Sequence, residues 1–177
     1  MRHVQFKEKA VVIRKAEPAE RTAAVELTLA AYSEYERGMP RPVFDNYMEN
    51  IRQAVQSDDR AALWLLFDSG ALVASTLFYP AAVKVYSALD QGSPYPEVRL
   101  LAVHPDARGR GYAKVLMEHC IALAKAEGAS GIGLHTSDLM TSAQALYAKL
   151  QFERYPEADF YPTADLCVKG YRLRFGA

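Results

Sequence analysis

Hydrophobic positions along the first half of the chain predict three strands and two helices, and the second and third strands form a hairpin. Residues 10–14 alternate weakly and predict a first strand. Residues 23–35 and 43–56 predict two helices, the second from apolar side chains spaced three and four positions apart. Residues 62–68 and 71–79 are apolar stretches that flank an Asp-Ser-Gly turn, so together they predict a β-hairpin.

The second half of the chain alternates between strand and helix patterns. Residues 80–96 contain several prolines and are interpreted as an excursion between strands. Helices are predicted at 111–127 and 141–150. Strands are predicted at 97–103, 132–136, 152–156 and 167–175, the last two around a turn-rich segment.

This order of elements predicts an α/β (α+β) fold. Hairpins come early and a strand–helix–strand–helix unit comes late, which favours a mixed central sheet with helices on both faces. No repeat, low-complexity tract or linker interrupts the pattern, so we expect one domain spanning 1–177. A length of 177 residues is enough to bury a single core.

Composition and charge exclude several classes of protein. Lys plus Arg and Asp plus Glu both number 21, so the net charge gives no general attraction to nucleic acid or to an acidic membrane. The longest apolar run, 61–67, is too short to cross a bilayer, and residues 1–9 lack the apolar core of a signal peptide. We therefore expect a cytoplasmic protein. Two cysteines, Cys120 and Cys167, are expected to be buried and reduced.

The candidate chemistry lies where the strand at 97–103 passes into the helix at 111–127. The connecting sequence is Arg108-Gly109-Arg110-Gly111-Tyr112-Ala113, followed by Lys114. Glycines let the backbone approach a ligand closely, and the first amides of a helix bind anions. Three basic side chains add positive charge at the same place, so the sequence predicts a phosphate-binding loop.

Other phosphate-binding loops match less well. A nucleoside-triphosphate loop needs a Gly-Lys-Ser/Thr ending, which is missing. A dinucleotide fingerprint needs Gly or Ala where Lys114 stands and an opening βαβ unit, whereas this junction lies past the middle of the chain. A glycine-rich surface turn with solvated arginines remains the alternative without function.

The junction resembles the central motif of the GNAT superfamily of N-acetyltransferases. That motif reads Arg or Gln, two residues, Gly, one residue, then Gly or Ala, and Arg108, Gly111 and Ala113 fill it. The preceding Leu-Ala-Val-His-Pro at 101–105 and the later segment 143–152 also resemble family motifs. The resemblance implies the acyl-CoA N-acyltransferase fold, with a mostly antiparallel sheet.

The resemblance also implies a co-substrate, acetyl-CoA, and the residues that bind it. The strand at 97–103 would splay from the strand at 132–136, which leaves room for the thioester. Strand backbone would bind the pantetheine arm, and loop amides would bind the pyrophosphate. The expected cofactor-binding residues are Leu101, Ala102, Val103, Arg108, Gly109, Arg110, Gly111, Tyr112, Ala113 and Lys114.

Two residues are expected to move protons. A lysine-like amine has a pKa of ~10.4 and must lose a proton before it attacks a thioester. Tyr147 matches the family tyrosine that acts as general acid toward the CoA sulfur; packing alone is the alternative. Glu97 resembles the glutamate base of some members; an exposed carboxylate at a strand edge is the alternative. The chain departs from the second motif at Met140, often Asn, and at Gln151, normally Gly, which indicates an altered turn.

The acceptor site is expected between the first two helices, the excursion at 80–96 and the turn at 157–163. Its aromatic residues would be Tyr32, Tyr35, Tyr47, Tyr86, Tyr95, Phe160 and Tyr161, and its carboxylates Glu34, Glu36, Asp45 and Asp159. Aromatic and acidic side chains together could receive a small cationic amine. His104, His119 and His135 do not cluster by spacing, so we expect no metal and interpret them as structural or surface residues.

Three functions stay open from the sequence. The first is an acetyltransferase acting on a small-molecule amine, without nucleic acid or membrane partners and with a homodimer left open. The second is a module that binds acyl-CoA without turnover, against which Tyr147 weighs. The third is an NAD(P)-dependent oxidoreductase, which Lys114 and the late position of the loop oppose.

Overall fold

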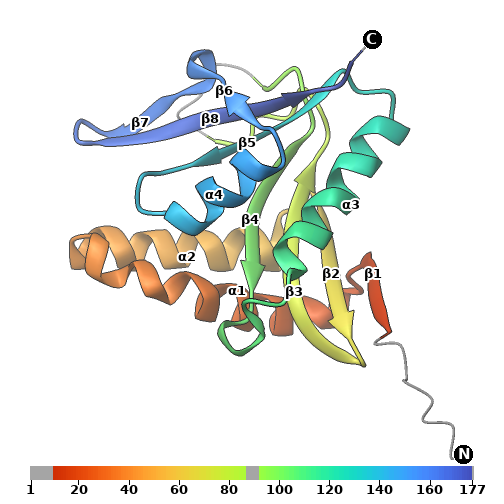
Figure 1. The fold of residues 1–177 in the computed structure, drawn as a ribbon. Helices are drawn as coiled ribbons and strands as arrows, with labels where there is room; N and C mark the ends of the chain where they lie inside the picture. Colours follow the sequence, from red (N-terminus) through yellow and green to blue (C-terminus); the bar gives the residue numbers. More distant parts are fainter. Residues whose placement is uncertain (1–9, 87–91, 177) are drawn as a thin grey trace, which may run out of the picture.

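The computed structural model describes residues 10–86 and 92–176. Within them, eight strands form one sheet in the order β1-β2-β3-β4-β5-β8-β6, with β7 paired to β8 (Figure 1). The strands are β1 (Val11–Lys15), β2 (Ala62–Asp68), β3 (Ala71–Tyr79), β4 (Glu97–Val103), β5 (Gly131–Thr136), β6 (Glu153–Arg154), β7 (Phe160–Thr163) and β8 (Leu166–Arg174). The expectation for residues 1–9, and part of that for 80–96, lies outside the described residues.

The sheet is mixed and mostly antiparallel, as the sequence predicts. Pairings β1–β2, β2–β3, β3–β4 and β5–β8 are antiparallel, and the β4–β5 pairing is parallel. That parallel pairing joins only Glu97 to Gly133 and Val98 to Leu134. Beyond these two pairs the strands diverge, and β5 turns away from β4 in Figure 1. The predicted splay is therefore present.

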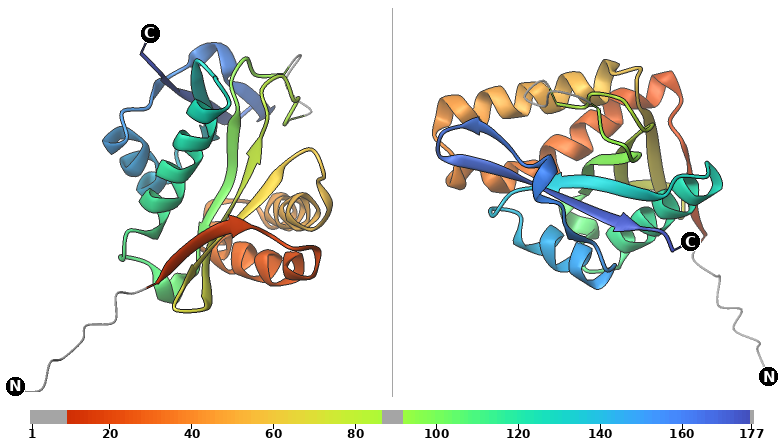
Figure 2. Two further views of the ribbon diagram at one scale, coloured as in Figure 1. Left: turned by 90° about the vertical axis from the view of Figure 1, so that its right-hand side faces the viewer. Right: turned by 90° about the horizontal axis from the view of Figure 1, so that it is seen from above.

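Helices cover both faces of the sheet. Helices α1 (Arg21–Tyr32) and α2 (Arg41–Ser57) lie on one face, and α3 (Tyr112–Ala126) and α4 (Thr141–Lys149) lie on the other (Figure 2). One apolar cluster joins α1 and α2 to the sheet through residues such as Val25, Ile51 and Leu77. Others join α3 and α4 to it through residues such as Met117 and Tyr147. The two-sided architecture is confirmed.

The single tryptophan of the chain lies under α3. Trp64 on β2 packs against both apolar clusters of that face. Its ring centroid is 4.4 Å from that of His119 on α3, in an edge-on arrangement. Burial lowers the pKa of His119, so the imidazole stays neutral and packs as an aromatic ring.

The first helix ends earlier than predicted. The sequence predicts helix to residue 35, but α1 ends at Tyr32 and Ser33–Gly38 form a 3-10 helix. Side chains occupy carbonyl groups at this end: the Ser33 hydroxyl donates to Ala30, and the Arg108 guanidinium donates to Ala31 at 2.9 Å. Side chains thus satisfy carbonyl groups that lose their backbone partners where the α-helix ends.

The C-terminal strands also differ from the prediction. The turn expected at 157–163 contains β7, which pairs with β8, and the strand expected at 152–156 contracts to the two residues of β6. Pro162 argues against a strand in sequence, yet proline is tolerated at a sheet edge, where its missing N–H breaks no ladder. Cys120 is buried as expected, whereas Cys167 is only half-buried.

Candidate active site

Strand β4 carries an irregularity at the point where a cavity opens. Leu77 pairs with Arg99 and Ser75 pairs with Ala102, so β4 has one residue more than β3 between these pairs. Leu100, in this β-bulge, has a φ of 56°, a conformation that costs a non-glycine residue on the order of 1–3 kcal/mol. With β5 diverging, the bulge exposes the edge of β4 to a cavity of about 410 Å³, which we call the donor cavity.

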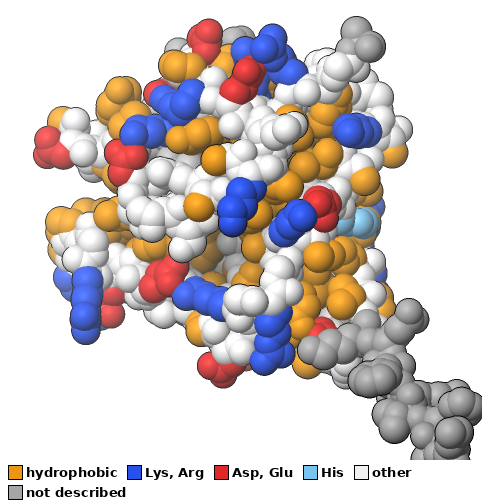
Figure 3. Space-filling view, viewed as in Figure 1, with side chains coloured by type: hydrophobic (Ala, Val, Ile, Leu, Met, Phe, Trp, Pro, Cys, Tyr) orange, Lys and Arg blue, Asp and Glu red, His pale blue; other side chains and the backbone are white. Residues whose placement is uncertain are grey.

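The loop between β4 and α3 forms the floor of the donor cavity. Gly111 is the N-cap of α3 with a φ of 84°, and Gly109 has a φ of 76°. A Cβ at either position would meet nothing within 4 Å, so the backbone conformation, and not crowding, requires glycine. The first turn of α3 contains no acidic residue, and Figure 3 shows basic side chains gathered around this end of the helix. The arrangement suits an anionic ligand.

Side chains of the loop hold it in place more than they reach the cavity. The Arg108 guanidinium donates to Glu34 at 2.6 Å and to the Ala31 carbonyl, which ties the loop to the end of α1. The Tyr112 hydroxyl donates to Asp68 at the end of β2. Lys114 lies 3.7 Å from Glu118 on the exposed side of α3. Backbone amides are therefore the main groups that this loop offers to a ligand.

Tyr147 borders the donor cavity from α4. Tyr147 is 6% exposed, and the centroid of its ring lies 5.8 Å from the ring centroid of Phe152. Burial raises the pKa of the Tyr147 phenol well above its ordinary value, so the hydroxyl stays protonated at neutral pH. Among the described residues, the hydroxyl has no hydrogen-bond partner. The phenol both packs and retains a proton that it can donate.

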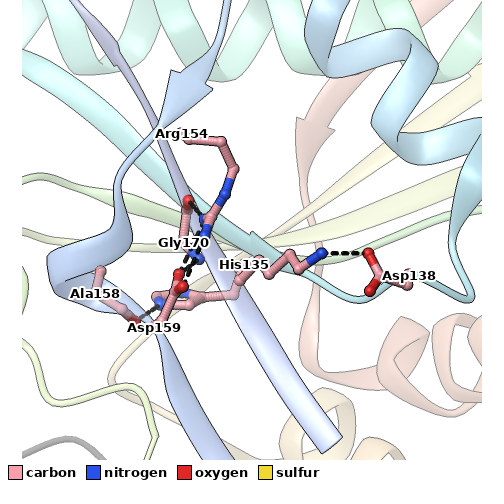
Figure 4. A network of polar contacts seen from close by, with 7 residues as sticks. His135, Asp138, Arg154, Ala158, Asp159 and Gly170 are labelled. Carbon is pink, nitrogen blue, oxygen red and sulfur yellow. Dashed lines mark hydrogen bonds and ion pairs between the residues drawn. The ribbon is translucent and has the colours of Figure 1, made fainter.

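Glu97 is buried, not exposed at a strand edge. It is 4% exposed, and burial raises its pKa to about 7, an effect that the nearby Arg99 partly opposes. Glu97 Oε1 lies 3.4 Å from Nδ1 of His135. On the other side of the ring, His135 Nε2 lies 2.8 Å from the Ala158 carbonyl oxygen (Figure 4). A carbonyl accepts, so Nε2 carries the ring proton and Nδ1 is bare. The two facing acceptors are compatible when Glu97 holds a proton between them.

A second cavity of about 260 Å³, which we call the acceptor cavity, meets the first one. The residues bordering both are Tyr32, Leu100, His135 and Met140. Aromatic and aliphatic side chains from α2, the excursion and the β7–β8 hairpin form most of its wall. Thr136 and Ser137 also line it, with hydroxyls that are buried and have no hydrogen-bond partner among the described residues. Two ligands could thus meet beside the bulge of β4.

Comparison with protein families agrees with this geometry. A model of the acetyltransferase (GNAT) family matches residues 25–152, which is most of the chain. The chain belongs to the GNAT acetyltransferase family. A comparison with curated proteins gives no match.

Solved GNAT structures share the fold at low sequence identity. A GNAT acetyltransferase from Staphylococcus aureus superposes with a TM-score of 0.66 at 19% identity, covering 94% of this chain and 100% of that one. PaiA N-acetyltransferase from Thermoplasma acidophilum, in complex with coenzyme A, gives 0.67 at 12% identity, covering 94% and 99%. The yncA structure from Salmonella typhimurium with acetyl-CoA gives 0.61 at 15% identity, covering 95% of each chain.

The residues that the GNAT motif singles out lie together in the structure. The donor cavity is lined by nine of the ten expected cofactor-binding residues, all except Arg110, and by Tyr147. Glu97 borders neither cavity, because its side chain points toward Gly133 and His135 on β5. Proton transfer to Glu97 would therefore need an intervening group.

The carboxylates expected at the acceptor site are engaged by other side chains. Each of its carboxylates is paired with an arginine: Glu34 with Arg108, Glu36 and Asp45 with Arg41, and Asp159 with Arg154. Figure 4 shows Asp159 held by Arg154 and by the backbone N–H of Gly170. None of these carboxylates lines the acceptor cavity.

The expected aromatic residues divide into three groups. Tyr32, Tyr47, Tyr86 and Phe160 line the acceptor cavity. Tyr35 lines the donor cavity. Tyr95 lines neither and packs against Tyr155 at 6.1 Å, while Tyr161 is 64% exposed.

Sequence reasoning missed His135 and Arg99. His135, interpreted as structural or surface, has a side chain that is 2% exposed and borders both cavities. The sequence signal for His135 was a polar residue inside an apolar strand. Its contact with Glu97 could not be predicted, because it depends on the register of β4 against β5.

The described part of the chain holds no cluster of three or more His, Cys, Asp or Glu suited to a metal ion. None of the helices within it combines the length and apolar character that a membrane span requires.

Proposed function

We propose that this GNAT protein is an acetyl-CoA-dependent N-acetyltransferase that acetylates a primary amine of a small molecule. Acyl donor and amine would be bound together, so that transfer is direct. The observation that carries the proposal is the junction of two cavities at the bulge of β4, one over an anion-binding helix end and one lined by aromatic side chains.

The residues of the donor cavity fit an acyl-CoA. The N-terminal amides of α3, with Gly109 and Gly111 in left-handed conformations, suit a pyrophosphate. The edge of β4 at Leu101–Val103 suits an amide-containing arm, because β5 does not pair with it there. When bound, acetyl-CoA supplies the activated acyl group as a thioester. Both halves of this fit use backbone groups, in agreement with a motif rich in glycine.

The side chains then have separate tasks in the transfer. The amine loses its proton, its nitrogen forms a bond to the acyl carbon, and the C–S bond breaks. Tyr147 donates the proton that the leaving thiolate takes, since its raised pKa keeps the phenol protonated until that step. Glu97, with a pKa raised to about 7, accepts the proton of the amine through an intervening water, because it borders neither cavity.

Ligand-induced stabilisation separates this proposal from an oxidoreductase. Acetyl-CoA at about 100 times its Kd should stabilise the fold by about 2.7 kcal/mol, or roughly 5–10 °C in Tm for a chain of this size. CoA should give a similar shift, and NAD should give none. A shift with NAD and none with acetyl-CoA would overturn the proposal.

Turnover separates an enzyme from a module that only binds acyl-CoA. Release of free thiol from acetyl-CoA is followed across a panel of primary amines and compared with hydrolysis without amine. At least one small amine should raise the rate well above hydrolysis. Binding of acetyl-CoA without turnover on any amine would favour the binding module.

A further inference from the structure

Arg99 is a guanidinium that the fold leaves without a carboxylate. It lies on β4 next to the bulge and is half-buried, yet it has no ion pair within the described residues. Its Cζ lies 5.0 Å from the ring centroid of Tyr86. Of the acidic groups nearby, Glu97 faces His135, and Asp58 is already bound by Arg60 at 2.6 Å and by the Tyr79 hydroxyl at 2.8 Å. A partly desolvated cation of this kind is costly unless a ligand pairs with it.

Other arginines of the chain show what Arg99 lacks. Arg14, Arg154 and Arg172 are also at least partly shielded, and each lies within 3.1 Å of a carboxylate oxygen. Arg99 instead borders the acceptor cavity and the open groove that continues from it along α2. Arg99 does not line the donor cavity. Its charge is thus directed at the acceptor side of the junction.

The acceptor cavity carries one sign of charge. Among the described residues that line it, none is Asp or Glu, and Arg99 is the single permanent charge. His135 adds no charge, because burial lowers its pKa. A polyamine would meet repulsion here, whereas a carboxylate could bind the planar guanidinium through two hydrogen bonds.

The rest of the wall suits a small apolar group. Val43, Tyr47, Phe160, Leu166 and Val168 line the cavity with aromatic and aliphatic surface. Its volume of about 260 Å³ is below the ~300–1,000 Å³ of pockets for drug-sized ligands. An occupant with one carboxylate, one amine and one apolar side group matches both the charge and the wall.

We propose that the acceptor is an amino acid with an apolar side chain, whose carboxylate is bound by Arg99 and whose α-amine is presented at the bulge of β4. This inference rests on the proposed function, in which the acceptor cavity receives the amine. It replaces the cationic acceptor expected from sequence by a zwitterionic one.

Matched pairs of amines that differ only in the carboxylate test the proposal. Phenylalanine is compared with 2-phenylethylamine, and leucine with isopentylamine, by kcat/KM in the thiol-release assay and by calorimetry on the CoA-bound protein. The wild-type protein should favour each amino acid over its decarboxylated partner. Arg99→Gln should lower kcat/KM and affinity for the amino acids by about 10–100-fold, in line with loss of a charged hydrogen bond. The same change should leave the decarboxylated amines within about threefold when rates are compared on the alkaline plateau of each variant, because Arg99 also lowers the pKa of Glu97.

Two further variants keep the test sharp. Arg99→Lys retains the charge but not the paired geometry, so it should lie between wild type and Arg99→Gln. Arg52→Gln removes an exposed arginine of α2, 3.5 Å from Glu49, and should change neither substrate class. Far-ultraviolet circular dichroism confirms that each variant folds.

The outcomes distinguish this proposal from the proposed function. Equal losses for both members of a pair in Arg99→Gln, or a wild-type preference for the decarboxylated amine, would overturn the role of Arg99. Absence of turnover with intact acetyl-CoA binding would overturn the acetyltransferase. Calorimetry would in that case still decide on Arg99, by whether phenylalanine binds and whether Arg99→Gln abolishes that binding.

Discussion

At the scale of single residues, the site depends on groups whose protonation is set by burial. Tyr147 and Glu97 are buried, and loss of contact with water favours their neutral forms. For Tyr147 this keeps a donor available to a thiolate. For Glu97 it raises the pKa to about 7, where a carboxylate can release and accept protons near neutral pH.

Removal of the Tyr147 hydroxyl should slow transfer without loosening the donor. We expect Tyr147→Phe to lower kcat by about 10²–10⁴-fold, the usual contribution of a general acid, with unchanged acetyl-CoA affinity. Stopped-flow thiol release and calorimetry measure the two quantities. Tyr95→Phe, outside both cavities, is the matched control and should leave kcat unchanged. An unchanged kcat in Tyr147→Phe would mean that the phenol only packs.

The pH dependence of the reaction should report Glu97. As a base, the carboxyl must be deprotonated, so kcat/KM should rise with pH through about 7. Glu97→Gln should lower kcat/KM and abolish this limb. If the variant kept the wild-type limb, the titrating group would lie elsewhere.

The stability of Glu97→Gln should depend on pH in a definite direction. A carboxyl whose pKa rises on folding favours the fold while protonated, and that contribution is lost as pH rises from about 4.5 through about 7. Glu97→Gln carries a neutral amide at every pH and does not lose this contribution. Its free energy of unfolding should therefore increase relative to that of wild type as the pH rises to ~8, by on the order of a few kcal/mol. His135 has its pKa lowered and acts in the opposite direction, but it is present in both proteins. Urea unfolding across this pH range measures the difference.

Some residue-scale features could be predicted from the sequence and others could not. The loop from Arg108 to Lys114 and Tyr147 follow local patterns that a motif records. The left-handed Leu100 does not, because leucine carries no local preference for that conformation. The pairing of Glu97 with His135 and the missing partner of Arg99 depend on which strands meet in space, and local sequence does not encode that.

At the scale of elements, the two ends of α3 are both closed by left-handed glycines. Gly111 has a φ of 84° at the N-terminus and Gly128 a φ of 75° just beyond the C-terminus, and neither position is crowded. Both glycines are therefore required for the same reason, a backbone with positive φ, while only Gly111 borders the donor cavity. This equivalence allows fold and ligand binding to be separated.

Alanine at these two positions should have equal effects on stability and different effects on binding. We expect Gly111→Ala and Gly128→Ala each to lower the free energy of unfolding by about 1–2 kcal/mol. Only Gly111→Ala should weaken acetyl-CoA binding, about tenfold or more, because the anion-binding amides shift. Urea unfolding and calorimetry provide the two numbers. Equal affinities in the two variants would place the pyrophosphate elsewhere.

Element prediction succeeded where one local rule dominates. The helix at 43–56 and the hairpin of β2 and β3 agree with the structure to within two residues. The end of α1 was misplaced, and at that end the distant residue Arg108 binds the Ala31 carbonyl, a contact that local sequence does not encode. Strand β7 was missed because Pro162 is acceptable only at an edge, and whether a strand lies at an edge is a property of the whole sheet.

At the scale of the whole molecule, the sheet consists of two parts joined by a short seam. Strands β1–β4 and strands β5–β8 are linked by two residue pairs, Glu97 with Gly133 and Val98 with Leu134. The donor cavity lies where this seam ends, and its lining comes from both parts. A ligand there would add contacts between the two parts of the sheet, next to this short seam.

Hydrogen exchange should show this effect. Acetyl-CoA should slow amide exchange in β4 from Leu101 onward, in the loop to Lys114 and in β5, because bound ligand suppresses local opening. Strand β1 and the β2–β3 turn should change little beyond the global stabilisation. Mass spectrometry of peptides after exchange measures this. Protection confined to β1 and β2 would contradict a donor site at the seam.

The packing of Trp64 against His119 gives the protein an optical signal of its own. The indole is the single strong emitter, and it touches α3 about 12 Å along the helix from Gly111, at 1.5 Å per residue. Any ligand that moves or stiffens α3 changes the surroundings of that one chromophore. Occupancy of the donor cavity can therefore be titrated by intrinsic fluorescence, without a dye, a label or a coupled enzyme.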